Sequence, residues 1–190
     1  MTKQELRKIY KQKRVSISPT ERLKLDDLLL IQLQRVALHN NIQFIMSFWP
    51  LEHHGEMNMH LFTRYLEHAF PDLKITFPII DFSSTKMHAI LVNDDTEFIE
   101  NKYGIPEPRE GEEVAAEELD LILVPLLAFD MNGYRVGYGK GFYDRFLKKC
   151  RNNVITIGFS YFDAVEKIED ANQFDVPLNY CITPHKVYEF

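Results

Sequence analysis

Hydrophobic and polar positions follow two kinds of pattern along the chain, and each pattern predicts one kind of element. Short apolar runs predict buried strands, because a strand covered on both faces need not alternate. Apolar positions three and four residues apart predict amphipathic helices. We expect strands at residues 42–49, 74–79, 87–92, 121–129, 154–159 and near 180–183, and helices from residue 2 and at 18–38, 59–70 and 142–150. Strands that alternate with helices favour an α/β fold with a mostly parallel sheet covered on both faces.

The segments between these elements carry weaker patterns. Pro106 and Pro108 are expected to keep the segment that ends at residue 108 extended, because proline fixes the backbone angle φ. Residues 107–120 hold seven acidic side chains against one basic side chain, which favours a short surface helix or loop over a cation-binding segment. Residues 160–173 are expected to form a helical segment or a loop.

Length and composition favour one globular domain over residues 1–190, with 45% hydrophobic and 26% charged residues. The longest apolar run, 121–129, is too short to span a bilayer, and no apolar signal segment follows the charged N-terminus. Cys150 and Cys181 have no paired spacing, which is typical of a reducing compartment. We therefore expect a cytoplasmic protein without a membrane partner, and a monomer. The net charge of -6 argues against a nucleic-acid partner.

The most informative stretch is the glycine-rich segment at residues 130–145, between a predicted strand and a predicted helix. It holds four of the eight glycines, at positions 133, 137, 139 and 141. Its charged side chains near these glycines are Arg135, Lys140, Asp144 and Arg145. Glycines let the backbone turn its N–H groups inward, and the first turn of a helix leaves N–H groups unpaired, so an anion fits there. The added cations favour phosphate.

Several alternatives stay open for this stretch. Asp144 can offset the helix dipole, or it can hold magnesium beside a polyphosphate. Asn132–Gly133 is a strong two-residue turn signal, so a hairpin is the alternative to a phosphate site. Residues 137–141 match neither the dinucleotide fingerprint nor the Walker loop, because a third glycine is missing and Lys140 is followed by glycine. The pattern alone leaves the substrate class open.

Two other regions contain candidate binding residues. The first helix opens with a capping box, Thr2 to Glu5, and then carries Lys3, Arg7, Lys11 and Arg14 on one face. This basic stripe is either a solvated surface or a face from which Lys3 and Arg7 reach the same anion as the glycines. Residues 51–56 form a loop at the carboxyl end of a strand, where α/β proteins bind ligands.

In that loop, Glu56 is a candidate for hydrogen bonding to an amide or ring N–H of a substrate. His53, His54 and Glu56 could alternatively form a metal cluster, although adjacent histidines in a polar loop more often just sit in water.

Four stretches together resemble the 5-formyltetrahydrofolate cyclo-ligase family, also called methenyltetrahydrofolate synthetases. They are residues 3–7, 104–108, 121–130 and 133–144. The resemblance implies a three-layer α/β/α sandwich. It also implies that ATP as co-substrate and Mg²⁺ drive closure of 5-formyltetrahydrofolate to 5,10-methenyltetrahydrofolate, with release of ADP and phosphate. In that family the formyl oxygen is thought to attack the γ-phosphate, and N10 then displaces phosphate.

The resemblance also implies roles for individual residues. Those matched to ATP contacts are Lys3, Gln4, Glu5, Leu6, Arg7, Arg135, Val136, Gly137, Tyr138, Gly139, Lys140, Gly141, Phe142 and Tyr143. Those matched to folate contacts are Glu56, either Trp49 or Leu51, and Tyr138, Gly139, Lys140, Gly141 and Phe142. Those matched to magnesium ligands are Asp144 and Asp175. The expected catalytic residues are Lys140, Arg135 and Tyr143.

Three positions depart from the family's pattern: Leu126 replaces a glycine, Phe174 a histidine and Asn179 an aspartate. Two competing functions remain. One is a non-catalytic module that holds a nucleotide or phosphosugar. The other is sugar-phosphate isomerase or CoA-transferase chemistry with Glu56 as base or nucleophile, which would leave Lys3 and Arg7 without a purpose.

Overall fold

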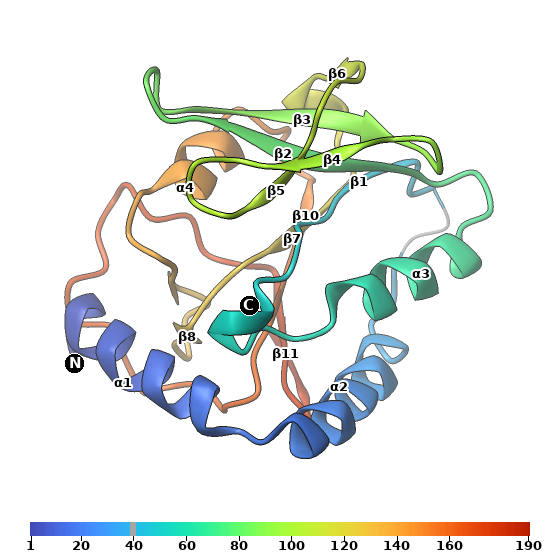
Figure 1. The fold of residues 1–190 in the computed structure, drawn as a ribbon. Coiled ribbons are helices and arrows are strands. Elements are labelled where there is room, and N and C mark those ends of the chain that lie inside the picture. Colours follow the sequence, from blue (N-terminus) through green and yellow to red (C-terminus); the bar gives the residue numbers. More distant parts are fainter. Residues whose placement is uncertain (39–40) are drawn as a thin grey trace.

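The computed structural model describes residues 1–38 and 41–190 and is organised around one large sheet (Figure 1). The helices are α1 (Lys3–Ser16), α2 (Pro19–Leu33), α3 (Met59–Ala69) and α4 (Phe142–Leu147), and the 3-10 turns are η1 (Glu52–His54) and η2 (Ala116–Glu118). The strands are β1 (Phe44–Met46), β2 (Lys74–Asp81), β3 (Lys86–Val92), β4 (Phe98–Glu100), β5 (Pro106–Pro108), β6 (Glu113–Val114), β7 (Leu121–Val124), β8 (Ala128–Phe129), β9 (Arg135–Val136), β10 (Ile155–Phe159), β11 (Tyr180–Ile182) and β12 (Val187–Glu189).

The main sheet has the strand order β12-β11-β10-β7-β1-β2-β3-β6. Neighbours from β11 to β2 run parallel, whereas β12, β3 and β6 pair antiparallel at the two edges. The carboxyl ends of the inner strands therefore meet at one edge of the sheet. This is the position at which open parallel sheets bind ligands.

Helices cover both faces of this sheet, and β7 shows how. Its alternate residues point to opposite sides. Leu121 and Leu123 pack in the cluster that contains the apolar side chains of α2 and α3. Ile122 and Val124 pack in the cluster that contains Phe146 of α4. Figure 1 shows α4 on the other side of the strands from α2 and α3. The predicted three-layer α/β/α sandwich is confirmed.

Helix α1 packs against a smaller antiparallel hairpin, β8–β9, rather than against the main sheet. The capping box at Thr2 and Glu5 is present. Leu6 and Tyr10 form a cluster with Ala128 and Val136 of the hairpin. The basic side of α1 is thereby placed against the glycine-rich segment that follows β9.

Several predicted bounds are wrong for local reasons. The strand predicted at 121–129 is broken, because Pro125 has no N–H to continue the ladder, and β8 belongs to the hairpin. A hairpin does form at Asn132–Gly133, where Gly133 has φ 81° and donates its N–H to Asp130 O at 3.1 Å. It ends at Val136, so it does not compete with an anion site at Gly137 to Gly141. The helix predicted to residue 38 ends at Leu33.

Short strands were also missed. Residues 98–100 and 106–108 pair as β4–β5, in a region predicted to be irregular, and β12 forms the sheet edge after β11. Each is only three residues long, too short for a hydrophobic period to be visible. Within the described part of the chain, no helix combines the length and apolar character needed to cross a membrane.

Candidate active site

A cavity of about 510 Å³ opens where the inner strands end. Its walls come from segments far apart in the sequence. They include Lys3 and Arg7 of α1, Trp49 to Glu56 after β1, Ile80 of β2, Tyr103 beside β5, and residues 137–144. The predicted loop, stripe and glycine-rich segment therefore meet in one site.

The glycine-rich segment crosses this cavity in a conformation that requires glycine. Gly139 and Gly141 have φ values of 97° and 69°, in the left-handed region that L side chains rarely adopt. Arg7 lies beneath the segment and donates its Nε to Gly137 O at 2.9 Å. A Cβ at position 139 would stand 3.2 Å from Arg7 Cζ. Glycine at this position thus lets Arg7 lie directly against the backbone.

The charges near this segment differ in whether they already have a partner. Arg135, which is buried, donates Nη2 to Asp144 Oδ1 at 2.9 Å and Nη1 to Val176 O. Burial lowers the pKa of the Arg135 guanidinium, and the neighbouring Asp144 opposes that shift. Lys3 donates Nζ to Asp175 Oδ1 at 2.7 Å. Lys140, in contrast, is exposed and joins none of the ion pairs found among the described residues.

The two predicted magnesium ligands, Asp144 and Asp175, line the same cavity. Asp144 Oδ1 accepts hydrogen bonds from Arg135 and from Val176 N, and Oδ2 accepts none from the described residues. Both oxygens of Asp175 accept from Lys3. No group of three or more His, Cys, Asp or Glu side chains suited to a metal exists in the described ranges. Two carboxylates still fit magnesium, which in phosphate sites takes its other ligands from phosphate and water.

Glu56 is buried in the wall of the same cavity with both oxygens engaged. Leu51 N donates to Oε2 at 2.8 Å, and the hydroxyl of Tyr138 donates to Oε1. Arg14 Nη2 lies 3.5 Å from Oε1. Burial, with the charge of Glu56 adding to it, raises the pKa of the Tyr138 hydroxyl. The hydroxyl therefore stays protonated and can donate to the carboxylate.

The metal cluster considered for His53, His54 and Glu56 does not assemble. The two imidazole rings lie 4.2 Å apart, centroid to centroid, but Glu56 is held by Leu51 and Tyr138 instead. Burial lowers the pKa of His54, which lines the cavity beside Tyr138. His54 is thus a neutral wall residue.

Aromatic side chains form part of the cavity wall. The rings of Phe82 and Tyr103 lie 4.2 Å apart, and Phe82 meets Phe142 edge to face at 5.3 Å. Trp49 and Leu51 both line the cavity, so either can serve as the expected apolar contact. Tyr143 turns its hydroxyl to a buried position with no hydrogen-bond partner in the described structure, and burial raises the pKa of that hydroxyl.

Neither Phe82 nor Tyr103 is among the site residues predicted from the sequence. Phe82 lies in the turn between β2 and β3, and the residues beside Tyr103 show no periodic pattern. Arg14 was named only as one member of the basic stripe. Its spacing of seven residues from Arg7 is the signal that places both on one helical face.

Four other predicted residues lie outside the cavity wall. Gln4 and Glu5 are exposed, and Glu5 closes the capping box with Thr2. Leu6 and Val136 are buried in the cluster between α1 and the β8–β9 hairpin. Their side chains position Lys3, Arg7 and Arg135 rather than face a ligand. The solvated interpretation of the basic stripe is wrong, because Lys3, Arg7 and Arg14 all bind other segments.

The three departures from the family pattern have distinct surroundings. Leu126 is buried and its carbonyl accepts a hydrogen bond from Arg14 Nη1 at 3.2 Å. Asn179 Oδ1 accepts from Thr156 N at 2.8 Å and so joins β10 to the segment before β11. Phe174 is exposed next to Asp175. The first two therefore serve packing of the sheet.

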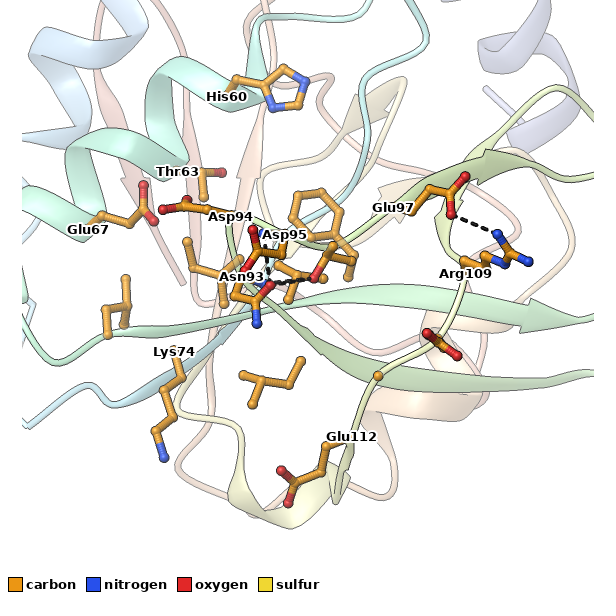
Figure 2. A pocket seen from close by; sticks show the side chains of 18 of the residues that line it. His60, Thr63, Glu67, Lys74, Asn93, Asp94, Asp95, Glu97, Arg109 and Glu112 are labelled. Atoms are coloured by element: carbon orange, nitrogen blue, oxygen red, sulfur yellow. Dashed lines mark hydrogen bonds and ion pairs between the residues drawn. The ribbon is translucent and has the colours of Figure 1, made fainter.

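A second cleft, of about 820 Å³, lies between α3 and the loop after β3, and Figure 2 shows its side chains. Six carboxylates and three cations line it. Among the described residues one ion pair lies in this cleft, between Arg109 and Glu97 at 2.8 Å, and the other five carboxylates join no ion pair. None of the predicted site residues lines this cleft. Its excess of carboxylates does not suit an anionic nucleotide.

The comparisons with known proteins point to one family. Residues 1–184 match the 5-formyltetrahydrofolate cyclo-ligase family. The chain belongs to this family. It is 33% identical over 159 residues to the 5-formyltetrahydrofolate cyclo-ligase of Mus musculus, a match that covers 78% of this chain and 74% of that protein. It is 30% identical over 122 residues to the Escherichia coli protein of that name, covering 62% of this chain and 66% of that protein.

The fold agrees with the family as well. The NMR structure of Aquifex aeolicus 5,10-methenyltetrahydrofolate synthetase superimposes with a TM-score of 0.81 at 30% identity, over 100% of this chain and 93% of that chain. The resemblance inferred from the four stretches is therefore confirmed. The non-catalytic module and the isomerase or transferase alternatives are set aside, because this cyclo-ligase family is a family of ligases.

Proposed function

We propose that this cyclo-ligase family member closes 5-formyltetrahydrofolate to 5,10-methenyltetrahydrofolate and consumes ATP in doing so. The observation that carries the proposal is the composition of one cavity. Its lining combines glycines and cations suited to a triphosphate with a buried carboxylate and aromatic side chains suited to a reduced pterin. Two substrates of these kinds would meet in this one cavity.

The glycines and cations of this cavity have the chemistry that phosphoryl transfer needs. Lys140 is free to bind a phosphate oxygen, and Arg7 is held at the segment by its own bond to Gly137. On binding ATP, Lys3 would give up part of its ion pair with Asp175 and contact a phosphate oxygen. Phosphoryl transfer depends on positioning and on stabilising charge more than on a protein nucleophile. The shortage of protein nucleophiles among the lining residues is consistent with that.

The buried carboxylate supports binding of N–H donors. A carboxylate such as Glu56 accepts two hydrogen bonds from adjacent N–H groups of a pterin ring, and Leu51 N and Tyr138 hold it in place. Trp49, Phe82 and Tyr103 offer apolar faces for the rings of the ligand.

In the proposed reaction the formyl oxygen attacks the γ-phosphorus of ATP, and ADP leaves. The formyl carbon, now bonded to a phosphorylated oxygen, is attacked by N10. N10 loses its proton, and inorganic phosphate leaves with the former formyl oxygen. Lys140 would stabilise charge on the transferred group, while Arg135 keeps Asp144 and the segment in position.

Asp144, through its free Oδ2, and Asp175 would hold magnesium beside the triphosphate. The metal would supply positive charge to the phosphate oxygens.

The test is the methenyl chromophore, which absorbs in the near ultraviolet. Purified protein with 5-formyltetrahydrofolate and Mg-ATP should produce this absorbance and release one ADP for each methenyl group. Omitting ATP, or chelating magnesium, should stop the reaction. Absorbance that grows without ATP would contradict the role of the nucleotide. No growth in the complete mixture would contradict the proposed substrate.

A further inference from the structure

Arg14 lies at the point where three segments of the site meet. Its side chain is buried, and the residue is only 3% exposed. Nε donates to His54 O at 2.9 Å, in the loop that carries Glu56, and Nη1 donates to Leu126 O, just after β7. Nη2 donates to the hydroxyl of Tyr138 at 2.6 Å. One guanidinium thus joins the folate loop, the central strand and the glycine-rich segment.

The bond to Tyr138 fixes the direction of the tyrosine proton. An arginine has donors and no acceptor, so the Tyr138 oxygen must accept from Arg14. The tyrosine's own proton is then free to point only toward Glu56, to which it donates. The order of bonds is therefore Arg14 to Tyr138 to Glu56.

Tyr138 itself is part of the glycine-rich segment, between Gly137 and Gly139. Arg7 binds Gly137 O from the same helix that carries Arg14. A phosphate that draws this backbone toward itself moves the Tyr138 ring as well. The position and the hydrogen bonds of Glu56 then change with it.

We propose that Arg14 and Tyr138 are positioning residues that couple nucleotide binding to folate binding through the Tyr138 hydroxyl. This inference rests on the proposed function, because it takes Glu56 as a folate contact and the glycine-rich segment as the nucleotide site. The first ligand to bind fixes Tyr138 between Glu56 and the segment. The second ligand meets a site that is already ordered, and it binds more tightly for that reason.

The decisive variant is Tyr138→Phe, which removes one oxygen atom and leaves the ring. The matched control is Tyr134→Phe in the same stretch, because the Tyr134 hydroxyl makes no hydrogen bond to the described residues and Tyr134 does not line the cavity. Arg14→Lys is the second variant. Lysine keeps the positive charge, but it lacks the planar guanidinium with which Arg14 donates to three separate acceptors.

The measurement is calorimetric titration of AMP-PNP with magnesium, in the absence and in the presence of saturating 5-formyltetrahydrofolate. In the wild-type protein the folate should lower the Kd of AMP-PNP by about tenfold, within the usual range of coupling between sites. The reverse titration must give the same factor. In Tyr138→Phe the factor should fall to within about twofold of unity; the factor is a ratio of two Kd values of the same variant, so a change in the Kd of AMP-PNP alone does not enter it. Tyr134→Phe should keep the wild-type factor.

Adding Arg14→Lys to Tyr138→Phe should cause no further loss of coupling, because both changes break the same link. Three results would overturn the inference: a wild-type factor of one, a wild-type factor that survives in Tyr138→Phe, or loss of binding of each ligand by itself in that variant. If the wild-type protein forms methenyl product but its two ligands bind independently, the inference is wrong and the proposed function stands. A protein that binds no folate would reject the proposed function.

Discussion

At the scale of single residues, the carboxylates Asp144, Asp175 and Glu56 already have hydrogen-bond partners. Asp144 is matched by Arg135, Asp175 by Lys3 and Glu56 by Tyr138. Such pairing holds side chains in place before a ligand arrives, which reduces the cost of ordering them. Lys140 has no such partner among the described residues, so it is the cation most available to a phosphate.

Lys140→Ala should therefore remove turnover without unfolding the protein. We expect kcat to fall by about 10²–10³-fold, the usual effect of losing one group that stabilises transition-state charge. The melting temperature should stay the same within about 1 °C, because exposed side chains contribute little to stability. Initial rates of methenyl formation and thermal melts check both statements. Lys149→Ala, an exposed lysine near the end of α4, is the control and should behave as wild type. Normal turnover in Lys140→Ala would remove its phosphate role.

At the scale of elements, the junction between β7 and β10 accommodates the buried side chain of Leu126. Gly158 pairs with Val124 across this junction. A Cβ at position 158 would collide with Leu126 Cδ2 and stand 2.8 Å from Leu178 Cδ1. The leucine side chain therefore fills the space that a residue larger than glycine would need in β10.

Gly158→Ala should destabilise the protein through this contact. We expect the free energy of unfolding to fall by about 1–3 kcal/mol, as for other overpacked cores. Leu126→Ala alone should cost about 2–5 kcal/mol because it leaves a cavity. In the double variant the added methyl group occupies part of that cavity, so the total loss should be smaller than the sum by at least about 0.5 kcal/mol. Urea denaturation of the four proteins gives these values, and simple additivity would contradict the packing argument.

At the scale of the whole molecule, a buried carboxylate joins the helices on one face to the loop after β10. Asp26 of α2 is only 5% exposed. Tyr161 donates its hydroxyl to Asp26 Oδ1 at 2.7 Å, and Asn58 N, at the start of α3, donates to Oδ2 at 3.3 Å. Burial raises the pKa of Asp26, although both hydrogen bonds oppose the shift. The folded protein thus binds this proton more tightly than the unfolded chain does.

This difference predicts how stability changes with pH. Protonation of Asp26 adds stability that is fully present below its ordinary pKa of 3.8 and is lost as the pH rises through the raised pKa of the folded state. Asp26→Asn has no carboxyl proton at this position, so the variant should not lose this stability as the pH rises. The free energy of unfolding of Asp26→Asn should therefore increase relative to that of wild type from acidic to neutral pH. Urea denaturation across that range measures the trend. The exposed neighbour provides the control Asp27→Asn, which should follow wild type. A constant difference between wild type and Asp26→Asn would contradict the raised pKa.

The sequence by itself determined the features that depend on local order along the chain. The apolar runs located the inner strands, because a strand buried on both faces is apolar at nearly every position. The glycines located the segment that needs positive φ angles, and the spacing of Lys3 and Arg7 placed them on one side of α1. These patterns were sufficient to predict a parallel sheet covered on both faces and an anion site at the glycines, whereas the family and most residues of the cavity wall were implied by the resemblance of four stretches to the cyclo-ligases.

Only the tertiary structure decided which of those residues meet one another. Arg14 is 42 residues from Glu56 and 124 residues from Tyr138, so no local pattern relates them. Phe82 and Tyr103 reach the cavity from the β2–β3 turn and the segment before β5, whose positions depend on packing over β2. The short strands β4, β5 and β12 likewise form because a neighbouring strand is present to pair with. Contacts between distant segments depend on the packing of the whole chain. That packing forms only when the main sheet and the helices on its two faces are together.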